Sequence, residues 1–122
     1  MPRKSMVMEF GMGTDIRGDD YTKAAVRALQ NALRQNTIRF AQAFGQSPED
    51  MHVTVDIGVA KPDQVDPDAV AAVLPYGKAT VNVVEGGLDT PREDVAGVTI
   101  VANAAVTVHL DLPDSVVEGA AT

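Results

Sequence analysis

The stretch VTIVANAAVTVHL, residues 98–110, decides the fold. Every even-numbered residue in it is apolar, whereas the odd positions include Thr99, Asn103, Thr107 and His109. Successive side chains of a strand point to opposite faces, so this pattern predicts a strand with one buried face. At about 3.3 Å per residue the stretch would span roughly 40 Å, which is long for a strand. We therefore expect a bend or bulge at residues 102–105.

Three further strands are predicted elsewhere in the chain. Residues 52–59 alternate in the same way, with valine or isoleucine on one face and His52, Thr54, Asp56 and Gly58 on the other. Shorter apolar runs at residues 5–10 and 79–85 are interpreted as the other two strands. The segment LDTPREDVAG, residues 88–97, is interpreted as a loop.

Two segments carry helix signals. The first follows a possible N-cap at Asp19 or Asp20 and is predicted to end near Asn36, or to continue over residues 38–44 to Gly45. Its apolar residues recur at helical spacing: Ala25, Val26, Leu29, Ala32 and Leu33. The second is a short helix that begins after Asp66, with Pro67 at its first position, and runs to Val73.

Taken together, these elements predict an α+β domain in which one long and one short helix cover one face of a four-stranded, mainly antiparallel or mixed sheet. We expect a single domain over residues 1–122, with an ordered core at 5–112 and a flexible tail at 113–122. The other face of the sheet is small and polar. It is either exposed to solvent or a polar subunit interface around a symmetry axis.

Composition excludes several classes of function. The net charge is −7 and the pI about 4.6, which opposes binding to nucleic acid. Cysteine is absent, so disulfides and thiolate chemistry are excluded. The chain shows neither the apolar core of a signal peptide nor an apolar run of about 18 residues. We therefore expect a cytoplasmic protein that does not enter membranes.

The stretch EFGMGTDIRGDD, residues 9–20, contains the first candidate site. We interpret its three glycines, Gly11, Gly13 and Gly18, as a turn from strand to helix. Such a turn presents backbone N–H groups and the positive end of the helix dipole, which favours an anion. Arg17 would anchor the ligand and Asp15 would lie on the same side. In the alternative interpretation, Asp15 pairs with Arg17 or caps the helix. The glycine spacing matches neither a dinucleotide fingerprint nor a phosphate loop.

Four other residues are candidates. Lys78, after LPYG, could act as a cation or base, and Glu85, before two glycines, as an exposed carboxylate. Both could equally be ordinary residues at the ends of elements. Lys23 and Asn103 are further possible ligand contacts. His52 and His109 have no companion histidine at a metal-ligand spacing, so they are interpreted as surface or interface residues, and neither a metal nor a cofactor is expected.

Three stretches, EFGMGTDIRGDDYTKAAVRA, LPYGKATVNVVEGGL and TIVANAAVTV, carry a family resemblance. Together they resemble the Lin-type family of small conserved hypothetical proteins, which is defined by an N-terminal GxGxDxHG motif. The resemblance covers about residues 9–108. Arg17 stands where the motif has histidine. A guanidinium stays protonated, so a ligand-anchoring role survives this exchange and a general-base role does not.

The resemblance also implies an architecture. The plan is similar to the trimeric chorismate-mutase-like fold and to single repeats of ring-opening amidohydrolases. Those hydrolases use a serine activated by lysine. Here Ser5, Ser47 and Ser115 lie outside the shared motifs, and within the motifs only Thr22, beside Lys23, is available.

The functional hypothesis is a homotrimer whose clefts between neighbours bind a small polar molecule that is anionic or bears a carbonyl group. As an enzyme it would hydrolyse a cyclic amide or isomerise a carbonyl compound without a metal, with Asp15, Lys78 and Glu85 as the reactive groups. The alternative is a non-catalytic ligand-binding or structural trimer. A minor alternative is a tautomerase that uses Pro2 as its base.

Overall fold

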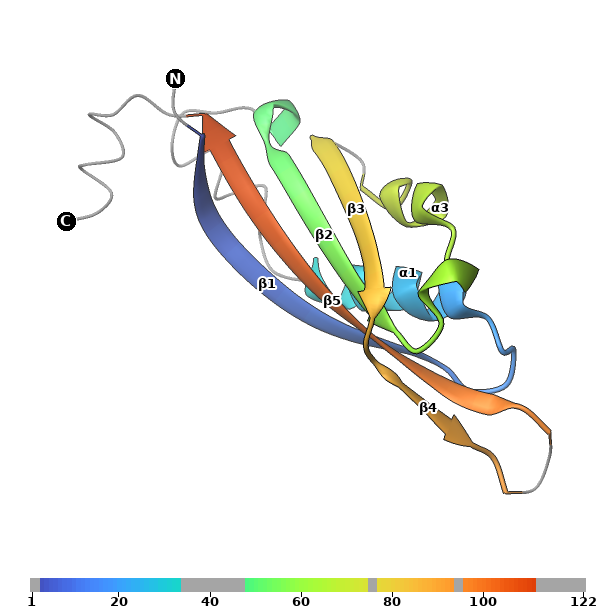
Figure 1. The fold of residues 1–122 in the computed structure, drawn as a ribbon. Helices are drawn as coiled ribbons and strands as arrows, with labels where there is room; N and C mark the ends of the chain where they lie inside the picture. Colours follow the sequence, from blue (N-terminus) through green and yellow to red (C-terminus); the bar gives the residue numbers. More distant parts are fainter. Residues whose placement is uncertain (1–2, 34–47, 75–76, 94–95, 112–122) are drawn as a thin grey trace.

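The computed structural model describes residues 3–33, 48–74, 77–93 and 96–111 (Figure 1). The elements run in the order β1 (Arg3–Asp15), α1 (Tyr21–Ala32), η1 (Pro48–Asp50), β2 (His52–Val59), η2 (Pro62–Gln64), α3 (Pro67–Ala71), β3 (Lys78–Glu85), β4 (Leu88–Pro91) and β5 (Val98–Asp111). The predicted α+β class is confirmed, with α1 as the long helix. Pro2, the predicted helical extension at 34–45 and the predicted tail at 113–122 lie outside the described residues.

The sheet is built around β5. The strand order is β1-β5-β2-β3, and β4 also pairs with β5. β5 is antiparallel to β1, β2 and β4, whereas β2 and β3 are parallel. Figure 1 shows β1 and β5 as long, curved neighbours, with α1 and α3 together on one side of the sheet. The sheet is therefore mixed, and the helices lie on one face as predicted.

The predicted number of strands was wrong, because the described sheet has five strands and not four. β2 pairs with β5 only as far as Gly58, opposite Asn103, and the start of β5 beyond that point pairs with β4. The four residues of β4 end in proline and do not alternate clearly. Their pairing comes from the unoccupied edge of β5, which a local pattern does not reveal.

Of the bend or bulge expected at residues 102–105, the bulge is not present. The pairing of β1 with β5 runs without interruption from Val7 opposite Val108 to Asp15 opposite Ile100. The register shift lies instead in β1, between Ser5 and Val7. β5 therefore keeps its alternation along its whole length, and its residues remain in line with those of β1 and β2.

The core lies between the sheet and the two helices. Helix α1 contributes four alanines and one leucine: Ala24, Ala25, Ala28, Leu29 and Ala32. The strands contribute larger apolar residues and one alanine: Val53, Val55, Ile57, Ile100, Ala102, Val106, Val108 and Leu110. Both predicted caps are present. The Asp20 carboxylate accepts the Lys23 N–H at 3.0 Å, and the Asp66 carboxylate accepts the Asp68 N–H at 3.0 Å. Each satisfies a backbone donor that the helix leaves free.

Gly11 and Gly13 lie inside β1 and not in the predicted turn. The backbone of α1 packs directly on them. A Cβ atom on Gly11 would lie 2.9 Å from the Cα of Ala32, and one on Gly13 would lie 2.7 Å from the carbonyl carbon of Arg27. The glycines are therefore required for the close approach of helix to strand, and the turn itself occupies residues 16–20.

We predict that Gly13→Ala lowers the free energy of unfolding by about 3 kcal/mol, because the added methyl group overpacks the contact between strand and helix backbones. Gly58→Ala is the matched control, since a Cβ there meets its nearest atom, the Cα of Gly86, at an ordinary 3.4 Å. Urea unfolding measures both variants. Equal stability of the two would contradict the packing role of Gly13.

Candidate functional site

The face of the sheet away from the helices, called the open face here, carries side chains in rows across the strands. The pairing of β5, β2 and β3 places them opposite one another as His109–His52–Lys78, Thr107–Thr54–Thr80, Ala105–Asp56–Asn82 and Asn103–Gly58–Val84. Polar side chains occur in all four rows, and the first two, at the end where β5 finishes, consist of two histidines, a lysine and three threonines.

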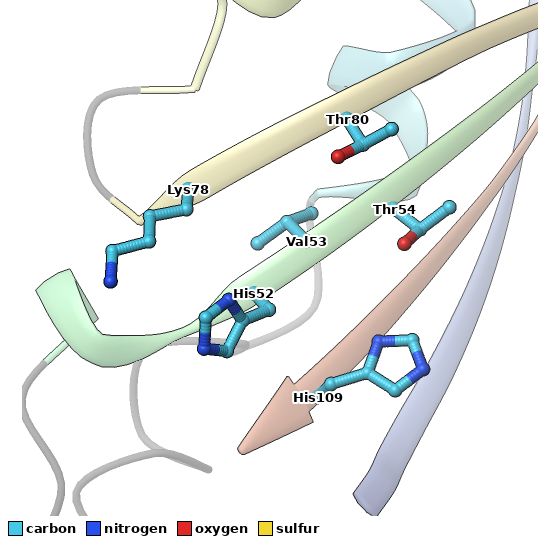
Figure 2. Close-up of a pocket in the computed structure, with 6 residues that line it drawn as sticks. All are labelled: His52, Val53, Thr54, Lys78, Thr80 and His109. Carbon is cyan, nitrogen blue, oxygen red and sulfur yellow. The ribbon is translucent and has the colours of Figure 1, made fainter. Parts of the chain in front are cut away.

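These two rows border a hollow of about 240 Å³. It is lined by His52, Val53, Thr54, Lys78, Thr80 and His109 (Figure 2). The figure shows the imidazoles of His52 and His109, the hydroxyl groups of Thr54 and Thr80, and the Lys78 side chain, which belong to β5, β2 and β3. No carboxylate belongs to this lining. A site of this composition can donate several hydrogen bonds to a carboxylate, an oxyanion or a carbonyl oxygen.

His52 is held in place from outside the hollow. Its Nε2 lies 2.9 Å from Oδ2 of Asp111, the last residue of β5. A carboxylate beside one ring nitrogen favours the proton on that nitrogen and leaves the other nitrogen free to accept a proton. Sequence analysis missed this pair, because Asp111 lies one residue beyond the predicted strand.

The predicted site residues do not gather in one place within a single chain. Lys78 lines the hollow, whereas Glu85 stands seven residues further along β3, which is about 23 Å away. Glu85 borders another hollow, of about 630 Å³, together with Ala60, Gly86, Gly87, Leu88 and Asp89. Asn103 is exposed in the fourth row of the open face. Lys78 is therefore the predicted residue that coincides with the histidine-lined hollow.

The turn after β1 is organised by Asp15. Its buried carboxylate accepts the Asp20 N–H at 2.9 Å and lies 3.7 Å from a guanidinium nitrogen of Arg27. Gly18 packs against the same carboxylate, since a Cβ there would lie 2.6 Å from Oδ2. Arg17 and Lys23 have exposed side chains. The geometry thus favours the structural interpretation of Asp15, with Arg27 and not Arg17 as its cation.

Tyr21 and Arg92 complete this end of the molecule, and sequence analysis identified neither. The buried Tyr21 hydroxyl donates a hydrogen bond to Asp89. Burial raises the pKa of Tyr21 to about 12, with further contributions from that hydrogen bond and from the negative charges of Asp89 and Asp19. Arg92 donates to the carbonyl oxygens of Ile16, Val98 and Ala96. These contacts join the turn to β4 and β5.

The described part of the chain shows neither a metal-binding cluster nor a membrane-spanning helix. Within residues 3–33, 48–74, 77–93 and 96–111, no group of three or more histidine, aspartate or glutamate side chains is arranged to hold a metal ion. No helix in the same ranges is both long and apolar enough to cross a membrane.

Comparison with known proteins identifies the family. The chain belongs to the family described as conserved hypothetical protein (Lin0512_fam), which matches residues 5–108. The crystal structure of an FtsZ-like protein of unknown function from Nostoc punctiforme PCC 73102 is similar, at 37% sequence identity and a TM-score of 0.81. The match covers 92% of this chain and 99% of that one. No curated protein matches the chain well enough to count as a relative.

We predict that Asp15→Ala lowers the free energy of unfolding by about 1–3 kcal/mol, because it leaves the Asp20 N–H without its partner. Arg17→Ala should change it by less than about 0.5 kcal/mol, as is usual for an exposed side chain. A double-mutant cycle between the two positions should show no coupling energy. A coupling energy above about 0.5 kcal/mol would show that Asp15 and Arg17 interact, which is the alternative that the sequence left open.

The raised pKa of Tyr21 predicts that the free energy of unfolding depends on pH in the alkaline range. Its folded-state pKa, about 12, lies above the ordinary value of 10.0, so its stabilisation is complete below pH 10 and is lost as pH rises towards 12. Tyr21→Phe should be less stable than the parent at pH 8, and the difference should shrink between pH 10 and 12. Urea unfolding across this range measures both proteins. A difference that stays constant would show that Tyr21 does not titrate there.

Proposed function

We propose that this member of the Lin0512 family binds a small polar molecule with a carboxylate or carbonyl group in the hollow of the open face. The observation that carries the proposal is the lining itself. Lys78 supplies a positive charge, and His52, His109 and two threonines supply donors, with no carboxylate among them. In a protein of net charge −7, such a site favours an anionic ligand over a cationic one.

The lining also supports a division of labour. Lys78 would pair with a carboxylate or polarise a carbonyl oxygen, and the hydroxyl groups of Thr54 and Thr80, one row away, would orient the rest of the ligand. Both threonines belong to strands and not to loops, so their positions are set by the pairing of β2 with β3. A preorganised site of this kind loses little entropy when it binds.

The enzymatic form of the proposal assigns proton transfer to His52. With Nε2 held by Asp111, Nδ1 would accept a proton from water, and the hydroxide would attack an amide carbon whose oxygen faces Lys78. The C–N bond then breaks as His52 returns the proton to nitrogen, which opens a cyclic amide. For isomerisation, the same nitrogen would remove a proton from the carbon beside a carbonyl group and return it elsewhere.

We also propose a homotrimer whose neighbouring subunits close this hollow. In a single chain the hollow lies on an open sheet face, and covering it would exclude water and strengthen its electrostatic interactions. As part of the same proposal, the fold of each subunit is similar to that of chorismate-mutase-like trimers and of single ring-opening amidohydrolase repeats. Glu85, far from the hollow in one chain, would take part only from another subunit, whereas the buried Asp15 would keep its role in the turn.

The alternative is a protein that binds the same class of ligand without turning it over. The oriented His52–Asp111 pair favours the enzyme, because simple binding requires only donors and does not require a carboxylate to hold an imidazole. The tautomerase alternative depends on Pro2, which lies outside the described residues.

Binding can be tested with a panel of small carboxylates, cyclic imides and cyclic ureides, followed by calorimetry. For the compounds that bind, Lys78→Gln should weaken the affinity about 10- to 100-fold, as expected for losing a charge-assisted hydrogen bond. Lys61→Gln is the matched control, since Lys61 is an exposed lysine before η2. Equal affinity of the Lys78→Gln variant and the parent would refute the proposed site.

Turnover is measured separately, as loss of ring absorbance in the cyclic compounds. His52→Gln should abolish turnover while the carboxylates still bind, which would assign proton transfer to His52. Asp111→Asn should lower the rate less and shift its pH profile. Binding without turnover in the parent protein would support the non-catalytic alternative.

A further inference from the structure

The side chains of β1 are inverted with respect to the core. From residue 9 onward its helix-facing residues are Glu9, Gly11, Gly13 and Asp15, which include no apolar side chain. The residues on its open face are apolar and exposed: Met8 at 55%, Phe10 at 67% and Met12 at 59%. A strand with one face in water normally shows the reverse pattern. In a single chain these three residues, called the β1 stripe here, therefore expose apolar side chains to solvent and do not bury them in the core.

A second apolar patch lies across the sheet. Val84 and Leu88, the β3–β4 patch, are exposed at 53% and 58%. Val84 is in the row that begins with Met12 and passes through Asn103 and Gly58, and Leu88 pairs with Val101 in the next row. The open face thus carries apolar residues at both margins and polar residues between them.

The edge of β1 is partly closed against another strand. The outward N–H of Met12 donates to the side-chain oxygen of Asn31 at 3.1 Å, and the outward carbonyl of Thr14 accepts from Arg27 at 2.7 Å. Both partners belong to α1. Because these backbone groups are satisfied within the chain, they are not open to pairing with an approaching strand at this end of β1. At residues 12–14, contact through the face is therefore favoured over extension of the sheet.

Charge does not oppose contact through this face. Among the described open-face residues the acids are Asp56 and Asp111. Asp56 accepts a hydrogen bond from Asn82 at 3.1 Å, and Asp111 lies beside His52 at 2.9 Å. The other acidic residues in the described ranges lie on the helix side and in loops, so two copies can bring these faces together without strong repulsion among the described groups.

The whole open face, which each copy would divide between two neighbours in a ring, is comparable in area to one side of a standard interface. At about 3.3 Å per residue and about 4.8 Å between strands, the five strands present roughly 700 Å² in projection. A standard interface buries about 800 Å² of accessible surface per partner. The stripe alone is too small, but the stripe and the patch together use both margins of the face.

We infer that the open face is covered by further copies of this chain, with the β1 stripe of one copy packed against the β3–β4 patch of the next. Two different patches on each copy make a heterologous contact, and such contacts form a ring when the rotation between neighbouring copies closes, as it does in a trimer. The polar rows then face the centre of the ring. This inference specifies which surfaces meet in the proposed homotrimer. It rests on the proposed function only for the number of subunits, which is three.

The test is the mass in solution by sedimentation velocity. The parent should have a mass near three subunits, and Phe10→Asp and Leu88→Asp should each reduce it to that of one. Ile16→Asp is the matched control, because Ile16 is 56% exposed but lies in the turn outside the stripe and the patch. Circular dichroism verifies that the variants are folded. A monomeric parent, or folded variants with unchanged mass, would overturn the inference.

A charge pair tests which surfaces meet. The double variant Phe10→Lys, Leu88→Asp should regain the parent's mass if the stripe meets the patch. If stripes meet each other, mixing Phe10→Lys with Phe10→Asp would restore assembly instead, and the proposed contact would be wrong.

The same variants separate assembly from ligand binding. Monomeric Phe10→Asp that binds carboxylates as tightly as the parent would support the inferred contact and contradict only the closing of the hollow by a neighbour. A parent that assembles as inferred but binds none of the compounds would leave the contact standing and remove the proposed function.

Discussion

The packing of the α1 backbone on Gly11 and Gly13 is the contact on which the rest of the structure depends. It requires that β1 have no side chains at these positions, and residues 9–15 of this strand place no apolar side chain in the core. The alanines of α1 serve the same close approach from the other side. As a consequence the large side chains of β1 lie on the open face, and the chain leaves β1 at Asp15, whose carboxylate then holds the turn into α1.

The central position of β5 in the sheet aligns the residues that form the candidate site. It is antiparallel to both β1 and β2, and β2 is parallel to β3, so residues far apart in sequence stand in straight rows. Lys78 and His109 flank His52 for this reason alone. The hollow, the Asp111 contact and the apolar margins are consequences of the same register. One constraint therefore links the packing of the core to the properties of the face proposed for binding and assembly.

The candidate site was predictable only in part. Lys78 was identified from its place at the start of a strand, but it was grouped with Glu85 and Asp15, which lie at the other end of the sheet. His52 and His109 were interpreted from their spacing as surface or interface residues, and their position beside Lys78 was not foreseen. Sequence separation between two strands carries no information on their register, and register decides which side chains meet.

The sequence by itself determined the α+β class, both helix caps, and the positions of β2 and β5, because each depends on local periodicity or on a side chain that reaches its own backbone. Only the tertiary structure decided the role of Gly11 and Gly13, the existence of β4, and the gathering of Lys78 with two histidines. Each of these depends on which segment lies against which. A glycine in a turn and a glycine beneath a helix have the same letter, and only the neighbouring backbone distinguishes them.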